Sequence, residues 1–134
     1  MHELNIPKDL FDRMLFHSRG GYPNEVCGIL AGIGNTASAL YETTNAEPSP
    51  VSYLMDPAEQ FRIMKDIRQK GLRMLAIYHS HPQSPPYPSS KDIGLAFYDD
   101  VFYMIVGLID QADPDVKIFR ITEGSVSESA VVLV

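Results

Sequence analysis

The sequence has a single cysteine, no cluster of basic residues and no long apolar run. Cys27 has no partner for an internal disulfide, which suits a reducing compartment. The net charge of −6 argues against a nucleic-acid partner, because such proteins usually display a basic face. No apolar run reaches the roughly 18 residues of a membrane span, and the first five residues lack the pattern of a secretory signal. We therefore expect a soluble, cytoplasmic domain with no nucleic-acid and no membrane partner.

The length of the chain predicts one domain, 1–134, and 45% of its residues are hydrophobic and can form a core. Apolar patterning predicts strands over 25–33, 36–44, 72–78, 101–109, 116–122 and 126–134, and a short extended piece over 51–55. Helices are expected from Pro7 to about Gly20, from the N-cap Asp56 to Gly71, and from Ser89 to about Tyr98. In the second helix, Phe61, Met64 and Ile67 are expected to face inward. This pattern predicts an α/β fold, a single-domain mixed β-sheet flanked by helices.

Two histidines, His79 and His81, stand one residue apart at the end of an apolar run. Strand side chains repeat every two residues, so both imidazoles point to the same side if that run is a strand. Neutral imidazole is the commonest metal ligand, and chemistry concentrates where a strand passes into a loop. A single histidine is more often a core or surface residue, so the pair carries the prediction. His2 and His17 receive no role.

Asp92 follows His81 by eleven positions, across a loop stiffened by four prolines. Two imidazoles and one carboxylate are what a catalytic zinc site needs, because it keeps its fourth position open for water. Ser89 and Asp92 also have the spacing of a helix capping box, which explains both residues without a metal. The two interpretations are compatible, since an aspartate in the first helical turn can face the strand end.

Glu25 is a candidate base because a hydrolytic zinc site needs a carboxylate to move the proton of its water. A carboxylate in front of an apolar strand can enter a desolvated cleft and have a raised pKa. Spacing alone does not single it out among the 17 acids, most of which are expected to be solvated.

The segment from His79 to Asp92, HSHPQSPPYPSSKD, matches the H-x-H-P-x6-S-x2-D signature of the JAMM (MPN-plus) zinc metalloprotease family. The segment from Pro23 to Gly32 also resembles the glutamate-bearing first strand of that family. The resemblance covers essentially the whole chain and implies the MPN/JAMM fold, which is similar to that of cytidine deaminases. Cys27, two residues beyond the glutamate, is expected to be a small buried hydrophobe with no ligand role.

The resemblance implies a role for each matching residue. His79, His81 and Asp92 would bind one zinc ion, and Glu25 would hold and deprotonate the zinc water. The hydroxyl of Ser89 would help to stabilise the oxyanion of the tetrahedral intermediate. The implied activity is that of a zinc metallopeptidase or isopeptidase.

The short chain shows no obvious insertion and therefore resembles the stand-alone bacterial or archaeal members. These are similar to peptidases that act at the Gly-Gly tail of ubiquitin-like sulfur carriers, so the implied partner is such a carrier or its C-terminal peptide. Residues 51–55 could pair with that tail as an added strand. Two alternatives stay open. One is a non-catalytic MPN-type interaction module, although such modules generally lack a site residue. The other is a RadC-like protein, although those carry an additional DNA-associated region.

Overall fold

The computed structural model describes residues 3–134, which form seven strands and three helices. In chain order these are β1 (Glu3–Ile6), α1 (Lys8–Gly20), β2 (Cys27–Ile33), β3 (Thr36–Glu42), α2 (Pro57–Gln69), β4 (Arg73–His81), α3 (Ser90–Gly94), β5 (Phe102–Gly107), β6 (Asp115–Thr122) and β7 (Ser125–Leu133). His2, which received no role, lies outside the described residues. None of the helices in this range is long and apolar enough to cross a membrane.

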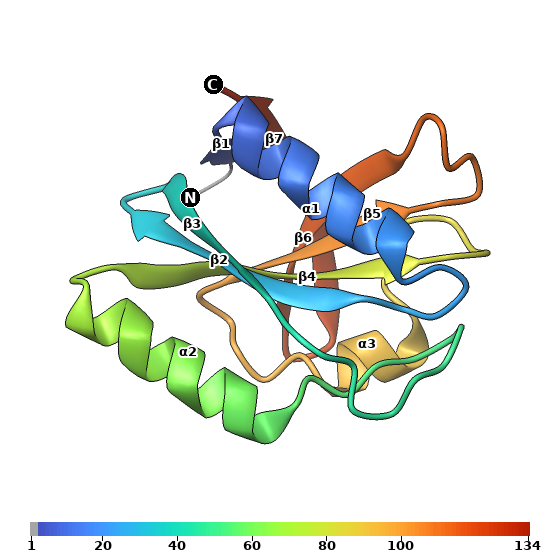
Figure 1. The fold of residues 1–134 in the computed structure, drawn as a ribbon, viewed down its shortest axis with the longest axis horizontal. Helices are drawn as coiled ribbons and strands as arrows, with labels where there is room; N and C mark the ends of the chain where they lie inside the picture. Colours follow the sequence, from blue (N-terminus) through green and yellow to red (C-terminus); the bar gives the residue numbers. More distant parts are fainter. Residues whose placement is uncertain (1–2) are drawn as a thin grey trace.

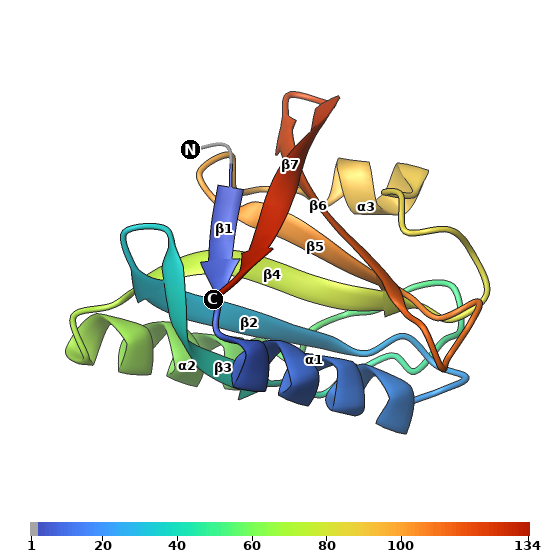
Figure 2. The same cartoon turned by 90° about the horizontal axis from the view of Figure 1, so that it is seen from above.

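The strands form one mixed sheet that closes on itself in the order β1-β3-β2-β4-β5-β6-β7. β4 runs antiparallel to β2 and parallel to β5. β1 pairs in parallel with β7 along its whole length and with β3 through Asn5. Figure 2 shows β1 and β7 side by side, which brings the two ends of the described chain together. The predicted mixed sheet with flanking helices is confirmed.

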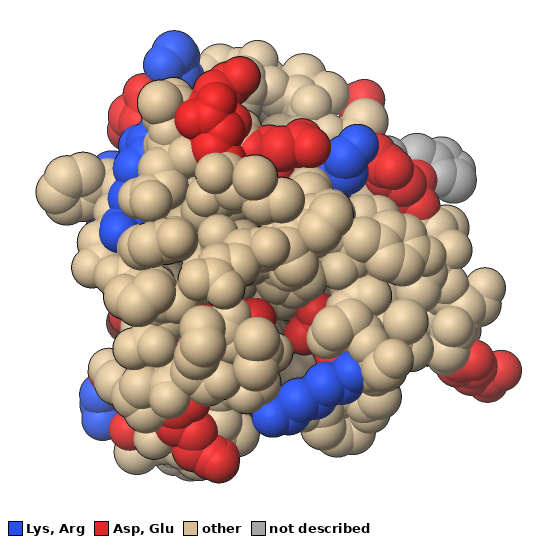
Figure 3. All heavy atoms as spheres, turned by 90° about the vertical axis from the view of Figure 1, so that its right-hand side faces the viewer, with Lys and Arg blue, Asp and Glu red and all other residues tan. Residues whose placement is uncertain are grey.

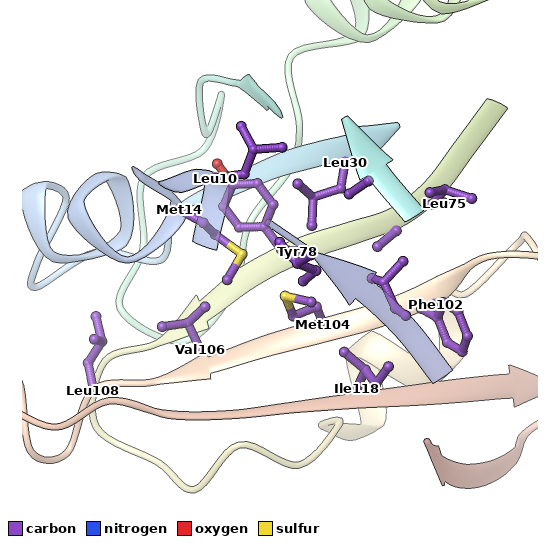
Figure 4. Close-up of a cluster of buried hydrophobic side chains, with 14 residues drawn as sticks. Leu10, Met14, Leu30, Leu75, Tyr78, Phe102, Met104, Val106, Leu108 and Ile118 are labelled. Atoms are coloured by element: carbon purple, nitrogen blue, oxygen red, sulfur yellow. The ribbon is translucent and has the colours of Figure 1, made fainter. Parts of the chain in front are cut away.

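Two hydrophobic cores lie on opposite faces of the sheet. The first fills the closed sheet around Tyr78 and Phe102 and packs against Met14 of α1 (Figure 4). The second includes Ile77 and is covered by Ile67 of α2. Figure 1 shows α1 and α2 on opposite sides of β2 and β4. Each amphipathic helix therefore covers its own face of the same strands.

The alternation of β4 decides which face carries the histidines. Tyr78 belongs to the core under α1, whereas Ile77 belongs to the core under α2. His79 and His81 follow Ile77 in steps of two, so they lie on the α2 and α3 side of the sheet. The expectation that both imidazoles share one face is confirmed.

Several predicted boundaries were wrong for physical reasons. Strand β1 was not predicted, because four residues are too few to show a period. The strand expected over 25–33 begins only at Cys27, since the Glu25 N–H donates to Ser49 outside the sheet. The extended piece 51–55 is irregular apart from one bridge between Asn45 and Met55. The helix expected to reach Tyr98 ends at Gly94.

The prediction that Phe61 faces inward was also wrong, because Phe61 is 72% exposed. Helical residues advance by about 100° each, so Phe61 lies roughly 120° around α2 from Ile67. Ile67 is buried against the sheet, and Met64 lies between the two positions with intermediate exposure. A helix packed against a sheet buries only a narrow stripe of its surface, so α2 cannot bury both Phe61 and Ile67.

Gly28 is required by the packing of Tyr78. A Cβ atom at position 28 would overlap the Tyr78 ring, which is fully buried and whose hydroxyl oxygen lies 2.6 Å from Nδ1 of His17. The rigid ring has no free space into which it can move.

We predict that Gly28→Ala lowers the free energy of unfolding by about 1–3 kcal/mol through overpacking. Thermal and urea unfolding measure the loss. Gly20→Ala is the matched control, because a Cβ there meets no atom within 4 Å. Equal stability of Gly28→Ala and the parent protein would contradict the packing described for Tyr78.

Candidate metal centre

Three polar side chains converge at the end of β4 and the first turn of α3. Nε2 of His79 and Nε2 of His81 lie 3.1 Å apart, and Oδ2 of Asp92 lies 3.2 and 3.1 Å from them. The donor atoms of the three residues all lie within 4.8 Å of one another. The structure thus brings together the three residues whose spacing predicted a metal site.

Neighbouring strands flank His79 on both sides and His81 on one side. His79 stands opposite Cys27 of β2 and Ile105 of β5, so its backbone is held between two neighbouring strands. His81 stands opposite Gly107, where a Cβ atom would crowd the ring of Pro86. The absence of a side chain at Gly107 therefore lets the proline loop close over the strand end. Both imidazoles are buried.

The proline loop also sets the orientation of the His81 ring. Nδ1 of His81 lies 2.9 Å from the carbonyl oxygen of Pro85. A carbonyl can only accept, so Nδ1 carries the proton and Nε2 presents its lone pair to the cluster when the ring is neutral. Burial opposes protonation of His81, but the hydrogen bonds to Asp92 and Pro85 outweigh it and raise its pKa. Burial dominates at His79 and lowers its pKa.

Asp92 is both a helix cap and a member of the cluster. Its Oδ2 accepts the Ser89 N–H at 2.9 Å, while Ser89 Oγ accepts the Asp92 N–H at 3.1 Å. Burial alone would raise the pKa of Asp92, but hydrogen bonds with His79 and His81 outweigh it and hold this pKa well below its usual range. The capping role of Asp92 is therefore compatible with a role as a metal ligand.

Glu25 lies outside this three-residue group but close enough to interact with it electrostatically. Its side chain is only 4% exposed, and Oε1 has no hydrogen-bond partner among residues 3–134. Burial raises its pKa to about 7; His81 and Lys91 oppose the rise and Asp92 adds to it. A buried, unsatisfied carboxylate is costly to keep, which marks a functional position.

Ser80, between the two histidines, bonds Val26, the residue after Glu25, to β4. Its Oγ accepts the Val26 N–H at 2.8 Å, and its N–H donates to the Val26 carbonyl at 2.9 Å. Ser80 points away from the cluster because it is out of phase with His79 and His81. The same short strand end thus carries two cluster residues and holds the chain beside Glu25.

Tyr53 was missed by the sequence analysis. Its ring packs on the His79 ring with centroids 4.7 Å apart and planes at 31°, and burial raises its pKa. Nothing in the irregular segment around Tyr53 distinguishes it from any other tyrosine. The contact arises only when that segment folds back over β4.

A cavity of about 170 Å³ opens beside the cluster. His79 and Asp92 line it together with mostly apolar side chains, and Lys91 stands among them. Figure 3 shows a hollow on this face of the molecule, with acidic atoms inside and a basic side chain at its edge. The donor groups of His79 and Asp92 are therefore reachable by a small group from this cavity.

The closed mixed sheet carries two histidines at the end of β4 and faces an aspartate in the first turn of α3, and these three residues could hold one metal ion. A family model described as prokaryotic homologs of the JAB domain matches residues 7–122, and the chain belongs to this family. The family predicted from the sequence is thereby confirmed.

Among curated relatives, the CysO-cysteine peptidase of Mycobacterium tuberculosis is 34% identical over 133 residues, covering 98% of this chain and 91% of the relative. The desampylase of Haloferax volcanii is 37% identical over 109 residues, covering 76% and 78%. Both names are those of enzymes.

Among solved structures, protein DSY2949 from Desulfitobacterium hafniense superposes with a TM-score of 0.88 at 36% identity, covering 98% of this chain and 92% of the other. A structure described as JAMM, a metalloprotease-like zinc site in the proteasome and signalosome, superposes with a TM-score of 0.61 at 19% identity, covering 96% and 97%. The second likeness concerns the fold, and it confirms the predicted MPN/JAMM architecture.

Proposed function

We propose that this protein is a zinc-dependent peptidase that hydrolyses the amide bond after the Gly-Gly tail of a ubiquitin-like sulfur carrier. One observation carries the proposal: three metal-type donors converge near the buried carboxylate of Glu25, whose Oε1 has no hydrogen-bond partner among residues 3–134. A packing role does not explain that combination, because each of these polar groups costs free energy when buried.

The donor set suits zinc. Two imidazole nitrogens and one carboxylate oxygen make a three-ligand site of the catalytic type. When the His81 ring is neutral, its proton lies on the Nδ1 bonded to Pro85 and Nε2 offers a lone pair, while the low pKa of Asp92 keeps that carboxylate ionised. His79, His81 and Asp92 would hold the ion. When bound, zinc supplies a Lewis acid that lowers the pKa of water and polarises a carbonyl.

Glu25 moves the proton in this proposal. Its raised pKa in the metal-free protein, about 7, lies near the operating pH at which a group can both accept and return a proton. Glu25 would accept the proton of the attacking water and pass it to the leaving amine. Its burial removes competing solvent from that transfer.

Ser89 has a hydroxyl proton available for the oxyanion. Among residues 3–134, Ser89 Oγ accepts the Asp92 N–H, a bond that does not use the hydroxyl's own hydrogen. The capping box thus fixes the oxygen while leaving its O–H free to donate to the tetrahedral intermediate. One short helix start would supply both a ligand and an oxyanion donor.

The substrate class rests on the relatives and on the site. The names CysO-cysteine peptidase, desampylase and probable TtuB-protein conjugate cleaving protease belong to relatives that are 34% to 37% identical. A Gly-Gly tail suits a site whose donors lie in a narrow recess, because no side chain blocks the scissile carbonyl. Segment 51–55 offers little edge for strand pairing, since Ser52 and Leu54 already bond to Asn45 and Ala46. Steric exclusion would therefore dominate specificity.

We further propose that residues 1–134 act as one JAMM domain in the cytoplasm. The thiol of Cys27 is buried and unpaired, as suits a reducing compartment, and burial raises its pKa to about 11. Such a thiol is a poor ligand and a poor nucleophile.

The first prediction concerns the metal. The purified protein should bind about one zinc per chain, and His79→Ala, His81→Ala or Asp92→Ala should each lower that stoichiometry, because a three-ligand site has no spare donor. Elemental analysis after dialysis and zinc titration measures it. His17→Gln, outside the cluster, is the control and should keep zinc. Protein that takes up no zinc even when it is added would refute the proposal.

The second prediction separates the two catalytic roles. Glu25→Gln should keep zinc and lower kcat by about 10²–10⁴-fold, because the amide cannot accept the proton. Ser89→Gly should keep zinc and lower kcat by roughly 10²-fold through loss of the oxyanion donor. Glycine is chosen because it costs a helix N-cap only a few tenths of a kcal/mol, whereas alanine costs about 1. Full activity of Glu25→Gln with normal zinc content would assign the base elsewhere.

The third prediction concerns the tail. Carrier proteins with an extension after Gly-Gly should lose that extension, and a Val-Val tail should resist cleavage because its side chains clash with the recess. Mass spectrometry of the products measures the cleavage, with Glu25→Gln as the inactive control. Equal cleavage of both tails, or cleavage of lysine-linked ubiquitin chains alone, would reject this substrate but not the zinc peptidase.

A further inference from the structure

Asn45 stands between the end of β3 and segment 46–54, which folds back toward the metal centre. It is half-buried and forms an isolated antiparallel bridge with Met55, which closes the segment into a loop. Asn45 belongs neither to the cluster of donor atoms nor to the lining of the cavity. Any effect that it has on the reaction must act through another residue.

The carboxamide of Asn45 makes all four hydrogen bonds described for it with backbone groups. Oδ1 accepts the N–H groups of Glu47 at 3.1 Å and Leu54 at 3.0 Å. Nδ2 donates to the carbonyl oxygens of Glu25 at 3.0 Å and Ser52 at 3.3 Å. An asparagine side chain offers two donor hydrogens and two acceptor sites, so its capacity is filled. Rotating the amide by 180° would oppose like groups at every contact, so its orientation is fixed.

Glu25 depends on this loop for its backbone position. Its N–H donates to the Ser49 carbonyl at 2.8 Å, and its own carbonyl accepts from Asn45. Both backbone polar groups of Glu25 are thus bonded to segment 45–54 rather than to a strand. The first residue of β2 in the ladder is Cys27, opposite His79. The loop therefore holds the backbone of Glu25 itself, while Ser80 holds the next residue, Val26, and the two together set where the Glu25 carboxylate lies relative to the cluster.

The same loop reaches the cluster directly, because Tyr53 packs on the His79 ring. Ser52 and Leu54, on either side of Tyr53, are the two residues that Asn45 bonds at the far end of the loop. One carboxamide thereby joins the backbone of Glu25 to the segment that carries the ring against His79.

We propose that Asn45 is a positioning residue for catalysis, which holds the Glu25 carboxylate in register with the His79, His81 and Asp92 cluster. This inference rests on the proposed function, in which Glu25 moves the proton. A reacting group displaced by about 1 Å costs roughly 10²-fold in rate, so a loosened Glu25 lowers kcat without removing any ligand.

Two variants test the role. Asn45→Ala removes all four hydrogen bonds. Asn45→Asp is nearly isosteric and retains both accepted bonds, but it cannot donate to Glu25 or Ser52. Each should lower kcat by about 10- to 100-fold while KM and zinc per chain stay within about twofold. Asn45→Asp also serves if Asn45→Ala does not fold.

Amide hydrogen exchange, followed by NMR on the metal-free protein, supplies a readout besides activity. The Glu25 amide should exchange about tenfold faster or more in both variants, because the loop that carries its acceptor Ser49 loses hydrogen bonds to Asn45. The Ile29 amide, inside the ladder, should keep its protection. Thr44→Val is the matched control, since it removes a neighbouring 3.1 Å hydrogen bond to Glu59 without touching Glu25. It should match the parent in both measurements.

Each outcome decides between explanations. If the Glu25 amide exchanges at the parent's rate in both variants, the positioning role is overturned. It is also overturned if that amide exchanges faster while kcat stays at the parent's value. If Asn45→Ala lowers kcat but Asn45→Asp keeps the parent's kcat, the loss comes from the hydrogen bonds inside the loop. That result would overturn the proposed role of the bond from Asn45 to Glu25. A zinc-loaded parent protein that cleaves no carrier conjugate would refute the proposed function, while the exchange rates still decide whether Asn45 holds Glu25.

Discussion

A single oxygen atom, Oδ2 of Asp92, joins the helical and the sheet parts of the site. It accepts the backbone N–H of Ser89 and lies within about 3.2 Å of both histidine nitrogens. The capping bond starts α3, and α3 in turn brings the carboxylate to β4. Because the proline loop restricts the unfolded chain, little further conformational entropy is lost when this contact forms. The same atom therefore caps the start of α3 and supplies the carboxylate oxygen of the candidate metal centre.

Much of this arrangement could be predicted from short-range patterns. The two-residue period of β4 places His79 and His81 on one face, and the S-x-x-D spacing gives the capping box. Asp56 and Pro57 likewise begin α2 as expected, since the Asp56 side chain accepts from the N–H groups of Ala58 and Glu59. These features depend on neighbours within a few residues, so the sequence contains them directly.

The remaining features depend on contacts between distant segments. The raised pKa of Glu25 comes from burial under a loop some twenty residues further on, and the Tyr53–His79 contact comes from the same loop. Neither has a periodic signature. Phe61 was misplaced because an apolar residue on a helix indicates burial only if the helix meets its neighbour over a wide arc. Strand β1 is defined by its pairing with β7 rather than by its own four residues.

That pairing has a consequence for the order of folding during synthesis. Of the described strands, β1 is made first and its parallel partner β7 is made last, so the sheet cannot close until β7 has been synthesised. The segment from Glu25 to Gly107, which holds every residue of the candidate centre, is complete well before that. A nascent chain therefore holds the whole donor set while its sheet is still open and the core beneath α1 is still uncovered. Closure of such distant strands is intrinsically slow, which makes this intermediate the stage most exposed to misassembly.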